Sequence, residues 1–295
     1  MSDFAPFRSQ AAKETYLLRH QERSRAWPEP WTERMVPTSW GETYVRESGP
    51  ADAPPLVMLP GIGSPSYSLA PEAFGLAAHF RLYAVDNIYD VGRSVCSRQV
   101  KNADDFSAWL DSLFDALGLT TPNLLGLSYG GWIFTQYALR HPERVNKLVL
   151  LAPAGTVAPI NFAFVWRAVM TLLPGKKAMY RFADWAAPAM AKDPKWAQAR
   201  ENLIQDAQLG AKSFARRKMV PPLPLSDQDW GRLKVPTQLL FGDEEVIFEP
   251  RVAAEKIARV APQVKLEVMP GVSHDFFVVA AADVNQKALA FLKGT

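Results

Sequence analysis

The feature that most constrains the fold is a series of short apolar segments that begins at Pro54. They lack the alternation of polar and apolar residues seen in half-exposed strands, and helical stretches separate them. Strands of this kind are buried on both faces, as in a parallel sheet covered by helices. The segments are 55–60, 81–86, 123–128, 147–153, 237–242 and 265–271. The sequence therefore predicts an α/β fold with a mostly parallel, doubly wound sheet.

The segments before and between these runs complete the predicted sheet. Helices are expected near 102–117, 129–141, 249–260 and 280–293, and an N-terminal helix over 4–26 should end before the prolines at 28 and 30. Around Trp40-Gly41, "TERMVP" and "ETYVRES" alternate polar and apolar residues, which predicts an antiparallel hairpin at the edge of the sheet. Together these elements predict about eight strands.

One long interval, 156–234, has no convincing strand. A structureless loop of this size is improbable, so we expect a helical insertion that forms a cap. The predicted division is a core of 1–155 and 235–295 with a cap of 156–234. Aromatic residues of the interval should mostly bury the cap against the core, with some lining a pocket beneath it.

Composition gives no positive case for a nucleic-acid partner. The chain has 295 residues, and 33 Lys and Arg nearly balance 30 Asp and Glu. The net charge of +3 is not gathered into long basic runs. The densest basic cluster, "FARRKM" at 214–219, is interpreted as a solvated helix face.

Cysteine usage and the N-terminus predict a cytoplasmic protein. The single cysteine, Cys96, excludes an intramolecular disulfide and a multi-cysteine zinc site. No secretory leader and no run of about 18 apolar residues is visible, so we expect a soluble protein without membrane association.

Ser128 is the candidate nucleophile. It follows the apolar run 123–127 in "GLSYGG" and directly precedes a predicted helix. This G-x-S-x-G spacing is typical of a tight, strained turn that lifts a serine hydroxyl out of a sheet. Side chains at Gly126 and Gly130 would collide with the adjacent strand and helix.

A serine needs a base, and His274 is the candidate. It lies in "MPGVSHDFF", in the loop after the last predicted strand, from which it can reach back over the sheet edge. His20, His79 and His141 are interpreted as surface or helix-end histidines.

The base needs a carboxylate that fixes its tautomer and stabilises the imidazolium. The loop after 237–242 offers Asp243, Glu244 and Glu245. The order along the chain is then serine, acid, histidine.

Two backbone amides are expected to form an oxyanion hole. One belongs to Tyr129, which follows the nucleophile. The other should come from the loop "LPGIGSPS", where Gly61 allows close approach and Ile62 is the expected donor. The glycines of this loop lack the further signals of a phosphate-binding motif.

These residues resemble the α/β-hydrolase superfamily over nearly the whole chain. Besides "GLSYGG", the segment 83–94 resembles the family's Asp-x-x-Gly-x-Gly-x-Ser loop, with Asp86, Gly92 and Ser94 retained. Within the superfamily, three segments are most similar to bacterial carboxylesterases of the naproxen-esterase type: "FRSQAAKETY", "GPADAPPLVML" and "GDEEVIFEP". The resemblance implies ester hydrolysis through an acyl-enzyme, a helical cap over an apolar pocket, and no cofactor or metal.

The chain departs from the family pattern at two places. The oxyanion loop has Pro60 where the family usually has histidine, so the support of this loop must differ. The acid of the common pattern lies three residues after the strand-ending glycine, which makes Glu245 the first choice and Asp243 the second. Asp86 is expected to order its own loop.

The predicted function is a serine carboxylesterase acting on small to medium apolar or aryl esters. One alternative keeps the triad but cleaves a lactone or a carbon–carbon bond. Another is a ligand receptor on the same fold with slow or absent turnover, and a third is that Pro60 has abolished catalysis. Ser128 argues against the branches of the superfamily that use an aspartate nucleophile. The natural substrate, its stereochemistry and the oligomeric state are not indicated.

Overall fold

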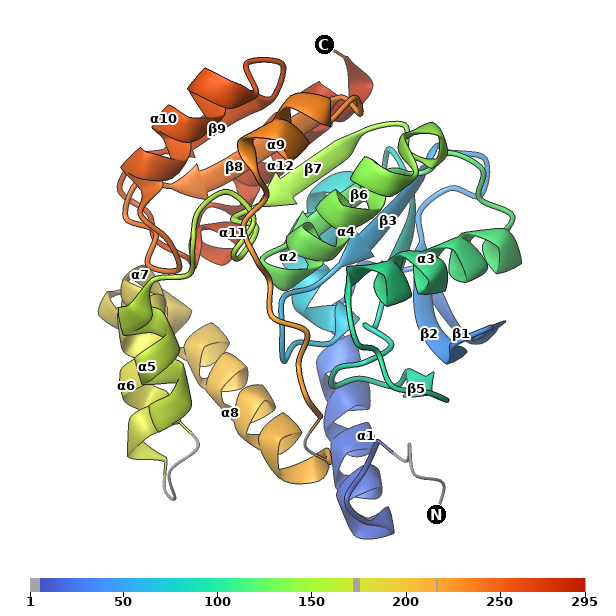
Figure 1. The fold of residues 1–295 in the computed structure, drawn as a ribbon. Coiled ribbons are helices and arrows are strands. Elements are labelled where there is room, and N and C mark those ends of the chain that lie inside the picture. The colour runs from blue at the N-terminus through green and yellow to red at the C-terminus, as the bar shows by residue number, and fades with distance from the viewer. Residues whose placement is uncertain (1–5, 172–175, 216, 295) are drawn as a thin grey trace.

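A nine-stranded sheet forms the centre of the protein (Figure 1). The computed structural model describes residues 6–171, 176–215 and 217–294. The strand order is β1-β2-β4-β3-β6-β7-β8-β9, and the short β5 pairs with β2. The strands are β1 Trp31–Thr38, β2 Gly41–Ser48, β3 Pro55–Leu59, β4 Arg81–Val85, β5 Val95–Cys96, β6 Asn123–Leu127, β7 Leu148–Leu151, β8 Thr237–Gly242 and β9 Lys265–Met269.

The predicted parallel sheet and edge hairpin are confirmed. The pairs β3–β4, β3–β6, β6–β7, β7–β8 and β8–β9 are parallel, whereas β1–β2 and β2–β4 are antiparallel. Strands β6, β7 and β8 are buried at every position, as their unbroken apolar sequences predict. The carboxyl ends of β3, β6, β7, β8 and β9 therefore meet at one edge.

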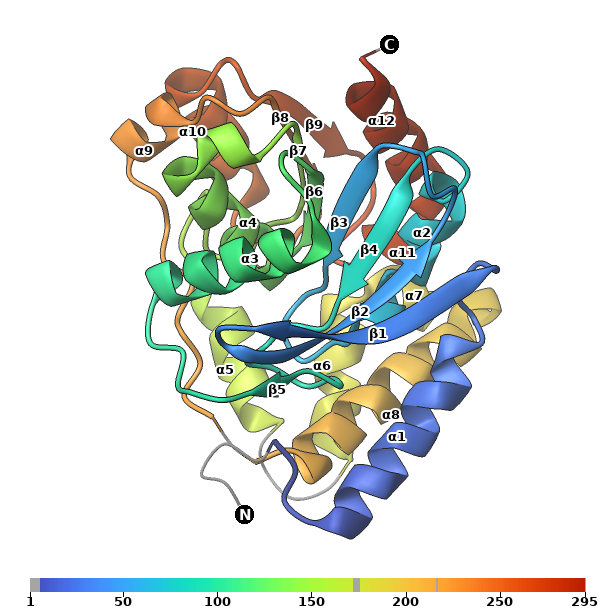
Figure 2. The ribbon, with the colours of Figure 1, turned by 90° about the vertical axis from the view of Figure 1, so that its right-hand side faces the viewer.

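Helices cover both faces of this sheet (Figure 2). Helices α3, α4, α9 and α10 lie on one face, and α2, α11 and α12 lie on the other. Their bounds are α2 Ala70–Leu76, α3 Ala103–Leu117, α4 Tyr129–Arg140, α9 Asp227–Arg232, α10 Pro250–Val260, α11 Phe276–Val279 and α12 Ala281–Lys293. The four helices predicted for this part of the chain are present, and the short α2, α9 and α11 were not predicted.

In the described part of the interval 156–234, helices α5 Phe162–Met170, α6 Lys177–Ala186, α7 Pro188–Lys192 and α8 Ala197–Ser213 lie between β7 and α9. They lie together beside the carboxyl ends of the strands (Figure 1). Phe164, Phe182 and Trp185 contact one another, with ring centroids 5.3 to 6.5 Å apart. These rings pack helix α5 on helix α6. The assignment of 156–234 as a separate cap stays a prediction.

The prediction of a helix over 214–219 is wrong for the residues that the structure describes. Helix α8 ends at Ser213, Phe214 is extended, and the described residues 215 and 217–219 have no regular secondary structure. Phe214 is buried and forms a β-bridge with Phe7, and Arg217 stacks over the ring of Tyr89 at 5.0 Å. Contacts with the N-terminal segment therefore replace helical continuation.

Helix α1 (Gln10–Ser24) confirms the N-terminal helix, but His20 is not on the surface. Its side chain is 2% exposed and lies edge-on to Tyr44 and Tyr67. Its Nε2 atom lies 3.6 Å from Asp86. The prediction failed because tertiary packing buries this face of the helix. Of the helices in the described residues, none is long and apolar enough to cross a bilayer.

Candidate active site

Ser128 occupies a strained turn between β6 and α4. Its backbone has φ 50° and ψ −112°, a conformation that is uncommon for a residue with a side chain. The Ser128 amide donates to the carbonyl of Leu151 at 2.8 Å, and its carbonyl accepts from Trp132 and Ala154. Hydrogen bonds from the next strand and the following helix thus hold the turn.

The glycines of the motif are required by close backbone contacts. A Cβ atom on Gly130 would lie 2.3 Å from the carbonyl oxygen of Leu59. A Cβ atom on Gly126 would lie 2.6 Å from the Cα of Gly131. Because both neighbours are backbone atoms, a side chain could not be accommodated by a rotamer change. These contacts confirm the steric reason predicted for the motif.

The loops after β8 and β9 bring His274 and Glu245 together. The Nδ1 atom of His274 lies 2.9 Å from Oε2 of Glu245, and the Glu245 side chain is fully buried. The other carboxylate oxygen accepts from the amides of Val246 and Ile247 at 2.8 and 2.9 Å. With both oxygens bonded, Glu245 is held as a carboxylate that places a proton on Nδ1 and leaves Nε2 as an acceptor.

The pKa values of this pair are shifted in opposite directions. Burial by itself would lower the pKa of His274, but the charge and hydrogen bond of Glu245 raise it above 6.5. Burial by itself would raise the pKa of Glu245, but the charge of His274 and three hydrogen bonds lower it below 4.5. The pair therefore favours an imidazolium next to a carboxylate.

Asp243, the second choice for the acid, has a different partner. Its carboxylate accepts a hydrogen bond from the amide of Gly271 at 2.7 Å, and its own amide donates to Met269. Gly271 has φ +69°, in the turn that leads from β9 toward His274. Asp243 thus fixes the turn that carries the histidine, whereas Glu244 is exposed.

The oxyanion loop lies directly against the nucleophile. A Cβ atom on Gly61 would lie 3.3 Å from the Cβ of Ser128. Ile62 follows Gly61, and Tyr129 is the first residue of α4, where amide groups lack partners inside the helix. The expected donors Ile62 and Tyr129 therefore directly follow Gly61 and Ser128, which lie in close contact. Among the hydrogen bonds of the described residues, none joins Ser128 to His274.

Asp86 orders loops, as the sequence predicted. Its two carboxylate oxygens accept from the amides of Ser66 and Arg93, at 2.6 and 2.7 Å. Burial would raise the pKa of Asp86, but His20 and these amides lower it. The side chain therefore connects the loop after β4 with the loop after β3.

Asp275 is a buried residue of the histidine loop that the sequence did not single out. Its side chain is 2% exposed and accepts a hydrogen bond from the amide of Met190, in α7, at 3.0 Å. Burial raises the pKa of Asp275, although the Met190 amide lowers it. The residue next to His274 is thus bonded to the helices that follow β7. No spacing in the sequence indicates such a contact.

Metal-binding side chains do not gather near these residues. Within the described part of the chain, no group of three or more His, Cys, Asp or Glu is arranged to hold a metal ion. Cys96 is buried as a free thiol, and its Sγ donates to the carbonyl of Arg98.

The strained Ser128, the His274–Glu245 pair and the loop at Gly61 lie at one sheet edge. This arrangement is typical of serine hydrolases. A model of the Alpha/beta hydrolase family matches residues 56–287. Since this range covers most of the chain, the protein belongs to the α/β-hydrolase family.

Two relatives from Bacillus subtilis (strain 168) match nearly the full chain. "Carboxylesterase YbfK" is 30% identical over 91% of this chain and 90% of its own length. "Uncharacterized carboxylesterase nap" is 29% identical over 94% and 91%, respectively. Among solved structures, naproxen esterase (carboxylesterase NP) from Bacillus subtilis has a TM-score of 0.87 and 27% identity. The superposition covers 96% of this chain and 99% of that enzyme.

Proposed function

We propose that the protein is a serine carboxylesterase that hydrolyses small to medium apolar or aryl esters. The observation that carries this proposal is the 2.9 Å contact between His274 and Glu245 at the same sheet edge as the strained Ser128. The names of the Bacillus subtilis relatives and the match along almost the entire chain support the same class of reaction. The protein's cytoplasmic location and its cap remain predictions.

Each residue has a role in the proposed mechanism. Ser128 Oγ attacks the ester carbonyl while Nε2 of His274 takes its proton. Glu245 holds the tautomer that leaves Nε2 free and stabilises the imidazolium. His274 then donates the proton to the leaving alcohol, and water repeats the sequence on the acyl-enzyme. Contacts between serine and histidine often tighten only in the substrate complex, so His274 need not bond Ser128 beforehand.

The proposed oxyanion donors are the amides of Ile62 and Tyr129. The negative oxygen of the tetrahedral intermediate would lie between them, because the loop after β3 touches the turn that holds Ser128. Preorganised backbone amides stabilise this charge without reorganising during the reaction.

Hydrolysis of short-chain p-nitrophenyl esters tests the proposal. We expect turnover by the wild type and a loss of about 10³-fold or more with Ser128→Ala. Labelling with a fluorophosphonate followed by peptide mapping should modify Ser128. Turnover unaffected by Ser128→Ala, or labelling of another residue, would contradict the mechanism. Absence of turnover on any ester or lactone would favour the receptor alternative.

A further inference from the structure

The loop after β3 is held by a contact from outside itself. A carboxylate from the loop between β4 and β5 supplies a contact at its centre. Oδ2 of Asp90 accepts a hydrogen bond from the amide of Gly63 at 2.7 Å. Oδ1 of Asp90 accepts from the amide of Val91, also at 2.7 Å. Asp90 therefore bonds one backbone group in each of two loops.

The expected donor Ile62 lies between two fixed neighbours. On one side, Gly61 is in close contact with Ser128. On the other side, Gly63 adopts φ +70° and is bonded to Asp90. The amide of Ser64 closes the turn by donating to the carbonyl of Gly61 at 3.3 Å. The orientation of the peptide groups around Ile62 thus depends on the anchor at Gly63.

We propose that Asp90 is a positioning residue for the oxyanion hole, whose carboxylate holds the Gly63 amide and thereby orients the amide of Ile62. This inference rests on the proposed esterase function. Asp90 does not touch the reacting atoms, so it acts through the loop.

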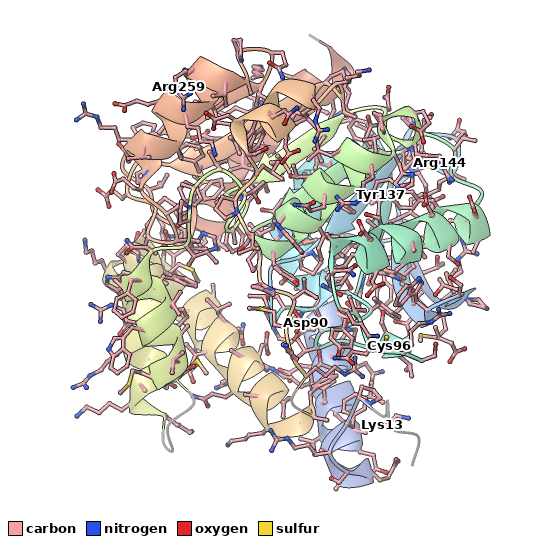
Figure 3. The ribbon with its side chains drawn as sticks, viewed as in Figure 1. Lys13, Asp90, Cys96, Tyr137, Arg144 and Arg259 are labelled. Atoms are coloured by element: carbon pink, nitrogen blue, oxygen red, sulfur yellow. The ribbon has the colours of Figure 1, made fainter. Side chains whose placement is uncertain are left out.

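Asp90 also faces a cavity of about 170 Å³. Ile62 and Tyr129, which carry the two proposed oxyanion donors, line the same cavity, and Arg217 enters it from the segment after α8. Figure 3 shows Asp90 between the central sheet and helices α1 and α8, which lie below the sheet in this view. A cavity of this size admits water, so the carboxyl group can exchange protons with solvent.

The surroundings of Asp90 shift its titration toward neutral pH. Burial raises its pKa to about 6, although hydrogen bonds from two amides lower it. Arg217 lowers the pKa, and Asp86, at the end of β4, raises it. Its charge also acts on Tyr16 of α1 and Tyr129 of α4. Protonation would weaken the acceptor for Gly63, because a neutral carboxyl is a poorer acceptor than a carboxylate.

Steady-state hydrolysis of p-nitrophenyl butyrate by two variants tests the proposal. Asp90→Asn keeps the size of the side chain and removes its charge, whereas Asp90→Ala removes the acceptor. We expect kcat to fall about tenfold in Asp90→Asn and up to about 10²-fold in Asp90→Ala, below the 10² to 10³ that follows loss of a complete oxyanion donor. KM should stay within about threefold in both, because the interaction matters in the transition state.

Arg93→Ala is the matched control. Arg93 lies in the same loop, and its side chain pairs with Glu33 at 2.6 Å, away from the loop after β3. We expect kcat within about twofold of the wild type, as for most surface ion pairs. An Asp90→Asn enzyme whose kcat equals that of Arg93→Ala overturns the proposal. This comparison uses only Asp90→Asn and Arg93→Ala, so it tests the proposal even if Asp90→Ala does not fold.

The acid limb of the pH profile distinguishes a positioning role of Asp90 from a purely structural one, because a structural role would leave the slope of this limb unchanged. Protonation of His274 abolishes activity, whereas protonation of Asp90 lowers it about tenfold, so the wild-type slope of log kcat/KM against pH should exceed one near pH 6 and return to one at lower pH. In Asp90→Asn the slope should be one throughout the acid limb. A slope above one that persists in Asp90→Asn contradicts the assignment. If Ser128→Ala leaves turnover intact, the proposed function fails instead, which separates the two outcomes.

Discussion

Replacing Glu245 by glutamine tests the centre of the proposed mechanism. The side chain is fully buried, and one of its oxygens is occupied by two backbone amides. In Glu245→Gln the amide oxygen would keep those two donors, so the NH₂ group would face Nδ1 of His274. This arrangement favours the tautomer with the proton on Nε2, which cannot accept the proton of Ser128.

The expected magnitude follows from this exchange of tautomer. In the Ser-His-Asp triad of a serine protease, a wrong histidine tautomer reduces kcat by about 10⁴. A factor of 10⁴ corresponds to about 5.4 kcal/mol of transition-state stabilisation. The longer glutamate does not alter this argument, because the 2.9 Å contact already has normal hydrogen-bond length. We therefore expect a loss of 10³ to 10⁴, approximately, in kcat.

The assay is p-nitrophenyl ester hydrolysis over a range of pH, with two control variants. Glu244→Gln removes an exposed neighbouring carboxylate and should leave kcat within about twofold. Asp243→Asn weakens the turn at Gly271 and should cost about tenfold or less. An Asp243→Asn enzyme that loses more activity than Glu245→Gln would refute the assignment of the acid, and so would a Glu245→Gln enzyme of nearly normal kcat.

The pH dependence has a defined sign. The base must be neutral, and Glu245 raises the pKa of His274 above 6.5, so kcat/KM of the wild type should rise through a pKa above that value. Without the charge of Glu245, burial lowers the pKa of His274. The residual activity of Glu245→Gln should therefore rise at lower pH than that of the wild type. A limb that moves to higher pH would contradict the assigned interaction.

Three further predictions concern stability, each measured by urea or thermal unfolding. Gly130→Ala should destabilise the protein by more than about 3 kcal/mol, because the added Cβ would lie 2.3 Å from a backbone oxygen. Gly118→Ala, where the added Cβ has open space, should cost only about 1 kcal/mol. Equal losses in the two variants would contradict the steric argument. Asp275→Ala should cost about 1 to 3 kcal/mol by leaving the Met190 amide unpaired, and Asp275→Asn, which keeps an acceptor, should cost less. The difference in unfolding free energy between the wild type and Glu245→Gln should be largest between pH 4.5 and 6.5. The contribution of Glu245 is lost as pH falls through its lowered pKa, and the contribution of His274 is lost as pH rises through its raised pKa. A stability difference that is independent of pH would argue against the pair.

The sequence by itself determined the sheet and the turn at Ser128. Apolar runs and helical periodicity are local signals, and strands buried on both faces cannot tolerate polar residues at many positions. The need for glycine at 126 is also local, because a Cβ atom there would meet Gly131 in the helix that follows the turn, whereas a Cβ atom at Gly130 would meet Leu59 of the neighbouring strand β3. Glu245, chosen from its position three residues after the strand-ending glycine, does contact His274, although its catalytic role stays a proposal.

Only the tertiary structure decided which buried polar groups meet. His20 is buried because α1 packs against residues from distant elements, and α8 ends before Phe214 because Phe214 pairs with the N-terminal segment. Asp90 reaches Gly63 because β4 lies next to β3 in the sheet, although Asp90 follows it by 27 positions in the chain. Such contacts depend on where loops converge in space. Spacing along the chain carries no record of that convergence, because a hydrogen bond between two loops imposes no periodic pattern on either of them.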